Sequence, residues 1–377
     1  MRRRTSLLAG ALVVLVSLLA APAQAGEGGN ANRYIVVLKK AVDPDAVAKI
    51  HASKYGAGVE TVWGHALHGY AAVIPNDRVA ALRSEATVSY VEADGEATIT
   101  AQTLPWGIDK IDADVSSTQA GNGSGAVSNV RVYVIDTGVD RNHPDLNVVS
   151  HVNFAKGQNT DCNGHGTHVA GTIAAKDDSQ GVVGVAPGAP VYGVKVLKCS
   201  GSGSWSMVIS GINWVTANHG ANAVANMSLG GGASQAVDDA VRNSAASGVF
   251  YAISAGNSGA NACGQSPARA GTTNGIATVA ATDSSDAEAS WSNYGSCVDI
   301  WAPGVSVLST YAGGGYNTLS GTSMASPHVA GGGALYLSTH SGATQSSVES
   351  ALKAAAVNTG KTSKDGRTIT RERVAGF

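Results

Sequence analysis

The stretch VIDTGVD, Val134 to Asp140, ends an apolar run at an acidic residue that a glycine soon follows. Such a run, stopping at a glycine turn, is typical of a buried strand leaving its sheet. From here on, apolar strands alternate with helical segments at 130–136, 165–175, 191–196, 205–219, 223–227, 234–247, 249–254, 276–280 and 323–338. The alternation predicts an α/β fold with a mostly parallel sheet covered by helices on both faces. Ligands of such folds bind at the carboxyl ends of strands, where Asp136 lies.

The tripeptide Asp136-Thr137-Gly138 admits three interpretations. It can supply half of an aspartic dyad, the orienting carboxylate of a Ser-His-Asp triad, or only a turn. A dyad within one chain needs a second apolar segment ending in Asp-Thr/Ser-Gly, and none follows Asp136. A dimeric dyad would belong to a small β protein, which the alternating pattern contradicts. The triad and the turn remain.

The amino-terminal segment predicts export. Residues 2–4 are arginines, residues 7–20 are apolar, and Ala23-Gln24-Ala25 is a small-residue cleavage site, so we interpret residues 1–25 as a secretory signal peptide. A membrane anchor is the alternative, but the apolar run is short for a span. The net charge of −2 gives no electrostatic argument for nucleic acid. We therefore expect a secreted protein with neither nucleic acid nor, after signal cleavage, a membrane as partner.

Two further features organise the chain. The segment from residue 33 to about 100 reads as strand, helix, strand, helix and strand at 34–38, 44–55, 69–74, 76–85 and 88–92, with apolar patches at 59–63 and 96–100. This pattern predicts a small α+β unit of the split-βαβ, ferredoxin-like kind. The four cysteines, which export allows to form disulfides with three pairings open, all follow residue 160: Cys162, Cys199, Cys263 and Cys297.

The stretch DCNGHGTHVAGT brings Cys162, His165 and His168 to spacings that resemble a zinc ligand set. Gly164 and Gly166 make its lead-in a loop, and no Glu follows His165 as in the zincin helix, which argues against a metal. His168 opens a small-residue helix, so its ring can point toward a neighbouring strand end. We therefore expect His168 to be a general base, with a purely structural His168 as the alternative.

Two later stretches carry candidate catalytic groups. In SGTSMASPHVAG, Ser323 lies where a loop enters a helix, a place that suits either a helix cap or a group beside which negative charge develops. The elbow motif Gly-x-Ser-x-Gly is not met, because Ala325 replaces its last glycine. In AISAGNSG, a buried strand ends at Asn257, which can serve the turn or donate its amide to an oxyanion.

Taken in order, these motifs resemble the subtilase (subtilisin-like) serine proteases: Asp136-Thr137-Gly138, His165-Gly166-Thr167-His168, Ala255-Gly256-Asn257 and Gly321-Thr322-Ser323-Met324-Ala325-Ser326-Pro327. The phrases NGHGTHVAGT, GVKVL, VANMSLGGG, SPAR and SNYGSCVD are most similar to the proteinase K subgroup and its aqualysin-like bacterial members. The resemblance implies a signal peptide over 1–25, a propeptide inhibitor and chaperone domain over 26–101, and a peptidase domain of subtilisin-like three-layer fold over 102–377.

The resemblance also implies roles. Ser323 would be the nucleophile, His168 its general base and Asp136 the residue that orients the imidazole. Asn257 and the Ser323 N–H would stabilise the oxyanion. Backbone edges at Gly201-Ser202-Gly203 and Ser228-Leu229-Gly230 would hold a peptide as an added strand. With Ala255-Gly256, the second edge would wall an uncharged slot that favours large apolar or aromatic side chains before the cleaved bond.

Several further expectations follow from the resemblance. The disulfides would be Cys162–Cys199 and Cys263–Cys297. Structural calcium would bind at Asp299, although the 268–276 segment that should supply carbonyl ligands is about three residues longer than in relatives, and Asp299 as an exposed turn residue is the alternative. No catalytic metal is expected. Partners would be protein and peptide substrates and the chain's own propeptide, which would act as an intramolecular inhibitor on a monomer. An inactive binding protein and an esterase are the rival functions.

Overall fold

The computed structural model describes residues 31–94 and 102–377. The chain divides into two compact units near residue 98, and each is described here by itself. The predicted signal peptide, the apolar patch at 96–100 and the expected propeptide end at residue 101 lie outside the described residues.

The first unit is a four-stranded antiparallel sheet with two helices. Its elements are β1 (Ala31–Leu38), α1 (Pro44–Tyr55), β2 (Gly58–Trp63), β3 (Gly69–Pro75), α2 (Asn76–Arg83) and β4 (Val88–Ala93), and the strand order is β2-β3-β1-β4. The Asp43 carboxylate caps α1 by accepting from Asp45 N–H at 3.1 Å, and Gly56 ends the helix in the left-handed conformation at φ 66°. These elements match the predicted α+β unit.

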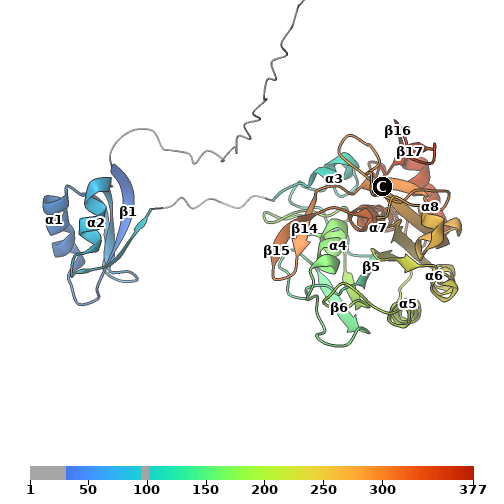
Figure 1. Cartoon of the computed structure of the whole chain (residues 1–377), viewed down its shortest axis with the longest axis horizontal. Coiled ribbons are helices and arrows are strands. Elements are labelled where there is room, and N and C mark those ends of the chain that lie inside the picture. The colour runs from blue at the N-terminus through green and yellow to red at the C-terminus, as the bar shows by residue number, and fades with distance from the viewer. Residues whose placement is uncertain (1–30, 95–101) are drawn as a thin grey trace, which may run out of the picture. The chain divides into compact units, whose positions relative to one another are not determined.

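The second unit is built on a nine-stranded sheet (Figure 1). The strands, in spatial order, are β16 (Val357–Thr362), β17 (Thr368–Arg371), β13 (Ile300–Pro303), β12 (Ile276–Thr282), β10 (Val249–Ser254), β8 (Ala223–Met227), β5 (Arg131–Asp136), β7 (Val191–Lys195) and β6 (Val148–Asn153). Every neighbouring pair is parallel except β16 and β17. The predicted mostly parallel sheet is confirmed.

Helices cover both faces of this sheet, which makes three layers. One face packs against α4 (His165–Ala174), α7 (Thr322–Thr339) and α8 (Gln345–Ala355), and the other against α5 (Trp205–Asn218) and α6 (Gln235–Ala246). Side chains of β5 alternate between the two cores: Val132 and Val134 face the first, Tyr133 and Ile135 the second. Because both faces are buried, the strands read as continuous apolar runs.

Several elements differ from the prediction. The sequence pattern did not indicate β6, β13, β16, β17, α8 or the hairpin of β14 (Val307–Tyr311) and β15 (Gly315–Leu319). Most of β15 and β16 is exposed or half-buried and polar, so no apolar run marks these strands. The remaining short elements are α3 (Trp106–Lys110), β9 (Gly231–Gly232), β11 (Gln265–Ser266) and three 3-10 helices at Ala113–Val115, Ala262–Gly264 and Ala268–Thr272. Within 31–94 and 102–377, no helix is long and apolar enough to cross a membrane.

Candidate active site

Asp136 is the last residue of β5 and its side chain is fully buried. Its Oδ1 accepts from Thr137 N–H at 2.6 Å and from His165 Nδ1–H at 2.7 Å. Its backbone carbonyl accepts from Val196 and Leu197 N–H, which follow the parallel strand β7. The carboxylate therefore sits at the carboxyl edge of the sheet, held against an imidazole.

His165 is the first residue of α4. Gly164 precedes it in the left-handed conformation at φ 102°, a backbone state that favours glycine, and this turn starts the helix at His165. Burial by itself would lower the pKa of His165, but the adjacent Asp136 carboxylate outweighs it and the pKa is raised. With Nδ1–H donating to Asp136, Nε2 is left as a proton acceptor on a side chain that is 26% exposed.

His168 does not reach Asp136, and the expectation that it is the general base is wrong. It lies one turn further along α4, fully buried, where Nε2–H donates to the carbonyls of Val307 and Asn317 at 3.0 Å each. Burial lowers its pKa to about 4. The physical reason is that the helix begins at His165, so the hairpin β14–β15 covers His168 and water cannot reach its ring.

Asp161 is a site residue that the sequence patterns did not single out. Its buried carboxylate accepts from the hydroxyls of Thr137 and Thr167 at 3.0 and 2.6 Å, and from the N–H groups of Asn163, Gly164 and Thr167 at 2.9 Å each. These bonds join the turn after Asp136 to the start of α4. Five bonds to one carboxylate are a strong tie, since hydrogen bonds to ionised groups are about twice as strong as neutral ones.

Ser323 lies in the first turn of α7 and is half-buried. Its hydroxyl donates to Ser228 O at 3.3 Å, and the Ser228 hydroxyl donates to Ser323 O at 2.8 Å. Asn257 follows β10, and its Oδ1 accepts from Thr322 N–H at 2.9 Å and from the Thr322 hydroxyl at 2.8 Å. Because both bonds use the amide oxygen of Asn257, its amide nitrogen is left to donate to another acceptor.

Two N–H donors flank the same small space beside Gly321. A Cβ added to Gly321 would lie 3.4 Å from Asn257 Nδ2 and 3.6 Å from Ser323 N. Both donors can therefore reach an oxygen atom placed in this space, which the missing side chain leaves open. This is the arrangement that stabilises a developing oxyanion.

Two clefts open onto these groups and share one wall, Leu229 to Gly231. The first has a volume of about 520 Å³, and its lining includes His165, Ser228, Leu229, Gly230 and the 201–203 backbone. The second, of about 350 Å³, is lined by Asn257, Ser323 and Gly256, among others, and by no charged residue. The predicted Ala255 is fully buried and is not among the lining residues, so Gly256 alone of that pair faces the cleft.

Comparisons with known proteins show which family this chain belongs to. A family model described as "Subtilase family" matches residues 127–374. The chain belongs to the subtilase family. A second model, "Peptidase inhibitor I9", matches residues 33–100 of this subtilase.

Two curated relatives illustrate the likeness. The subtilase is 45% identical over 322 residues to "Alkaline serine exoprotease A" of Vibrio alginolyticus, covering 81% of this chain and 58% of that protein's length. It is 45% identical over 310 residues to "Extracellular serine proteinase" of Thermus sp. (strain Rt41A), covering 79% of this chain and 73% of the relative. A solved structure described as a cold adapted subtilisin-like serine proteinase matches with TM-score 0.65 and 44% identity, covering 71% of this chain and 97% of that one.

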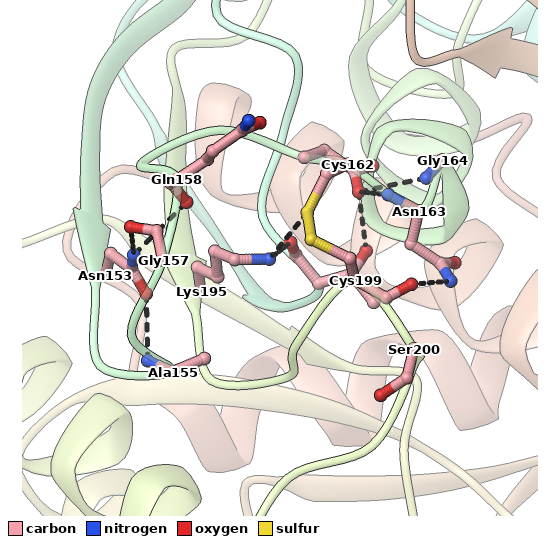
Figure 2. The surroundings of a disulfide bond; sticks show 12 residues. Asn153, Ala155, Gly157, Gln158, Cys162, Asn163, Gly164, Lys195, Cys199 and Ser200 are labelled. Atoms are coloured by element: carbon pink, nitrogen blue, oxygen red, sulfur yellow. Dashed lines mark hydrogen bonds between the residues drawn. A yellow bond between two sulfur atoms is a disulfide. The ribbon is translucent and has the colours of Figure 1, made fainter.

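Disulfides brace the subtilase in two places, Cys162–Cys199 and Cys263–Cys297, which is the pairing that the resemblance implies. Figure 2 shows the first of them, with the Asn163 side chain donating to Cys199 O at 2.9 Å and Lys195 directed toward the Cys162 sulfur. The disulfide thereby ties the loop before His165 to the loop that leads into the cleft wall at 201–203.

The structure does not support Asp299 as a calcium ligand of this subtilase. Its Oδ1 pairs with the Lys353 ammonium at 2.9 Å, its Oδ2 accepts from Thr278 N–H at 2.9 Å, and its side chain is only 10% exposed. The ammonium beside the carboxylate opposes a second cation there, and Asp299 is not an exposed turn residue either. Among the described residues, no group of three His, Cys, Asp or Glu side chains could hold a metal ion.

Proposed function

We propose that this subtilase is a secreted serine endopeptidase of broad specificity that acts through Ser323, His165 and Asp136. The observation that carries the proposal is the 2.7 Å hydrogen bond between His165 and the buried Asp136 carboxylate. The cleft that His165 lines shares the wall Leu229 to Gly231 with the cleft that Ser323 lines. His165 Nε2 takes the Ser323 Oγ proton as the hydroxyl attacks the carbonyl carbon, and then gives it to the leaving amine. Water hydrolyses the acyl-enzyme by the same route. Asp136 fixes the tautomer and stabilises the imidazolium.

The tetrahedral oxyanion would occupy the space beside Gly321. Asn257 Nδ2 and Ser323 N–H would both donate to it, and both are already in place before substrate arrives. Removing one such donor typically costs about 3 kcal/mol of transition-state stabilisation.

Substrate would bind as an added strand along 201–203 and 228–230, a mode that reads main chain and tolerates many side chains. The uncharged cleft beside Gly256 supports a preference for large apolar or aromatic side chains before the cleaved bond. Peptide-library profiling tests this preference, and a dominant requirement for Arg or Lys would contradict it.

The calcium that the resemblance implies would bind at Asp145 rather than at Asp299. This carboxyl is 3% exposed and its Oδ1 has no hydrogen-bond partner, while burial raises its pKa to about 7. The carbonyls of Lys176 and Val182 both accept from the Gln102 amide, at 2.8 and 3.3 Å, so a cation between them would take the place of this NH2 group. Together with Asp178, which lies close enough to perturb Asp145, these groups offer the oxygen ligands that calcium prefers. Calcium here would neutralise buried charge and lock the 176–182 loop.

The precursor would carry a signal peptide over 1–25 and an inhibitory propeptide over 26–101, with a mature peptidase from 102 to 377. The match of residues 33–100 to the inhibitor model supports the propeptide role. The wild-type enzyme would then cut itself between about residues 100 and 102, and the released domain would be digested.

The test is Ser323→Ala in the full precursor, made in a protease-free host. Without the hydroxyl no acyl-enzyme forms, and loss of a triad nucleophile costs about 10⁶ in turnover. We expect the variant to accumulate as one chain beginning near Gly26 and inactive on casein, while the wild type yields a protein starting near residue 101. Normal self-processing by the variant would refute the assignment of Ser323.

A further inference from the structure

The turn that follows Asp136 is held by a histidine from the edge strand β6. His151 lies on β6, two strands from β5, and its ring reaches across β7 to the turn. Its Nε2 accepts from Val139 N–H at 3.1 Å, and its Nδ1–H donates to Asn159 Oδ1 at 2.7 Å. Because a backbone N–H can only donate, this pair of bonds requires the neutral imidazole with its proton on Nδ1.

The approach of the ring depends on two glycines. A Cβ on Gly138 would lie 2.9 Å from His151 Nε2, and a Cβ on Gly193 of β7 would lie 2.3 Å from His151 Cδ2. Any side chain at either position would therefore push the imidazole away from Val139. The chain leaves room for this ring where the turn and β7 pass it.

The same turn packs directly on α4, the helix that carries His165. A Cβ on Gly166 would lie 2.0 Å from Gly138 O and 3.1 Å from Asp136 Cβ, so the turn and the first residues of α4 are in close contact. Lys195 Nζ donates to the backbone carbonyl of Thr137, and the Thr137 hydroxyl donates to the Asp161 carboxylate. His151 adds a third tie to this turn, through the N–H of Val139. A shift of this turn would move Asp136 relative to His165.

We infer that His151 is a positioning residue, which keeps the Asp136 to Val139 turn in register with His165 only while its Nε2 carries no proton. This inference rests on the roles proposed above for Asp136 and His165. A proton on Nε2 would set two N–H groups against each other, and the bond to Val139 would break.

The surroundings of the ring decide the pH at which His151 Nε2 takes its proton. Burial, the largest effect, disfavours the imidazolium, and so do Arg141 and Lys195. The hydrogen bond to Asn159 and the Asp161 carboxylate favour it, and the net effect lowers the pKa of His151 below its usual 6.5. The pKa of His165 lies above 6.5. As the pH falls, His165 therefore takes its proton first and His151 its proton later, so activity is lost in two steps.

The experiment compares acid limbs of log kcat/KM for the wild type, His151→Gln and the control His219→Gln. His219 bonds Ser247 and Gly220 at the end of α5 and does not line either cleft. In the wild type the slope should rise above one, toward two, over the pH range in which His151 takes its proton, and the added loss should total about tenfold or more, as for removal of the acceptor. His151→Gln keeps an acceptor near Val139 without titrating, so its slope should stay at one, and His219→Gln should behave as the wild type. Tryptophan fluorescence at each pH confines the comparison to folded enzyme.

A second variant separates positioning from stability. His151→Leu removes the acceptor at every pH, so at pH 8 kcat should fall about tenfold or more with KM little changed, and His151→Gln should restore it. A slope of one throughout in the wild type, a slope of two in folded His151→Gln, or an unchanged kcat in His151→Leu would overturn the inference. Activity surviving in His165→Gln would instead overturn the proposed triad.

Discussion

His165 and His168 lie one turn apart on α4, and their neighbours give them opposite properties. The Asp136 carboxylate raises the pKa of His165, whose Nε2 remains an acceptor at the cleft. The β14–β15 hairpin covers His168, and burial lowers its pKa to about 4. Catalytic competence at this helix end is therefore decided by contacts made with segments distant in sequence.

Replacing Gly321 with alanine should slow catalysis strongly without disturbing the fold. Gly321 has φ 161°, which is extended backbone that any residue adopts, and the nearest atoms to an added Cβ lie at 3.4 Å or more. The methyl group would fill the space where Asn257 and Ser323 present their N–H groups. We expect kcat to fall about 10²- to 10³-fold, and Tm to change by less than about 3 °C.

The matched control is Gly232→Ala. Gly232 also lines the cleft of Ser323, but a Cβ there meets nothing within 4 Å. Its kcat should equal that of the wild type. Equal losses in the two variants would show that the space beside Gly321 has no special role.

Local sequence made Asp136, Ser323 and Asn257 candidates because each lies at or close to the end of a buried element, and the resemblance then implied their roles. The choice between two histidines on one helix could not be made in this way, since it depends on the hairpin that covers one of them. The one sequence feature that could have indicated His165 is Gly164, because this glycine takes the left-handed conformation and α4 starts directly after it. Asp161 carried no signal, because an Asp before a glycine-rich loop is ordinary in sequence.

At the scale of elements, the start of α4 is tied to the loop after β7 by Cys162–Cys199 and by the Asn163 side chain (Figure 2). The cleft wall at 201–203 follows this loop directly. Neither bridge lines a cleft itself, but Asn163, next to Cys162, lines the cleft of His165, whereas no residue directly next to Cys263 or Cys297 lines either cleft. The two bridges should therefore differ in their effect on substrate binding.

Each disulfide should stabilise the fold, but only the first should affect KM. The bridged residues are 37 and 34 apart, for which the chain-entropy model gives roughly 3 to 4 kcal/mol per bridge. Replacing Cys162 and Cys199 by serine should also raise KM about fivefold with kcat nearly unchanged. Replacing Cys263 and Cys297 should lower only the free energy of unfolding. Urea unfolding of inhibitor-blocked enzyme and steady-state kinetics measure both, and a KM rise in the second pair would contradict the account.

The loop from Lys176 to Val182 provides the calcium prediction. Chelator should lower the Tm of the wild type, because an ion bound only by the folded protein stabilises it by mass action. Asp145→Asn should have a low Tm that chelator no longer changes. Asp299→Asn should keep the wild-type response, since Lys353 occupies its carboxylate. A chelator response lost at Asp299 and kept at Asp145 would place the ion where the resemblance first implied.

Strands and helices with continuous apolar runs were predictable, and polar or exposed ones were not. β5, β8 and β10 are buried on both faces, and their nearly continuous apolar sequences predict this burial. In β14, Ser309 and Thr310 are buried, but their hydroxyls donate to α4 carbonyls at 2.8 and 2.7 Å. Such polar burial gives no apolar period, so this hairpin is visible only in the structure.

At the scale of the whole molecule, a buried carboxyl near the C-terminus makes stability depend on pH. Glu372 lies against Gly332 of α7, fully buried, and neither carboxyl oxygen has a hydrogen-bond partner. Burial raises its pKa to about 8, from an ordinary value of 4.5. Between these pH values the folded protein keeps a proton that the unfolded chain releases. Stability contributed by this group is therefore present below pH 4.5 and is lost as the pH rises to 8.

Glu372→Gln should remove this dependence. At pH 4.5 the variant and the wild type should unfold at similar urea concentrations, and at pH 9 the variant should be the more stable, by an amount on the order of 3 kcal/mol. Urea unfolding of inhibitor-blocked enzyme at the two pH values measures the difference. The same difference at both pH values would mean that Glu372 does not titrate in this range.

The most direct test of the proposed mechanism is the rate of casein hydrolysis per mole of folded protein in His165→Gln and His168→Gln. Loss of the base at His165 should lower the rate by more than about 10⁴-fold. His168→Gln, which replaces a ring buried under β14–β15, should unfold at a lower temperature but keep a rate within about tenfold of the wild type. A His165→Gln enzyme that retains a hundredth of the wild-type rate, or a folded His168→Gln enzyme that is inactive, would contradict the assignment of the base.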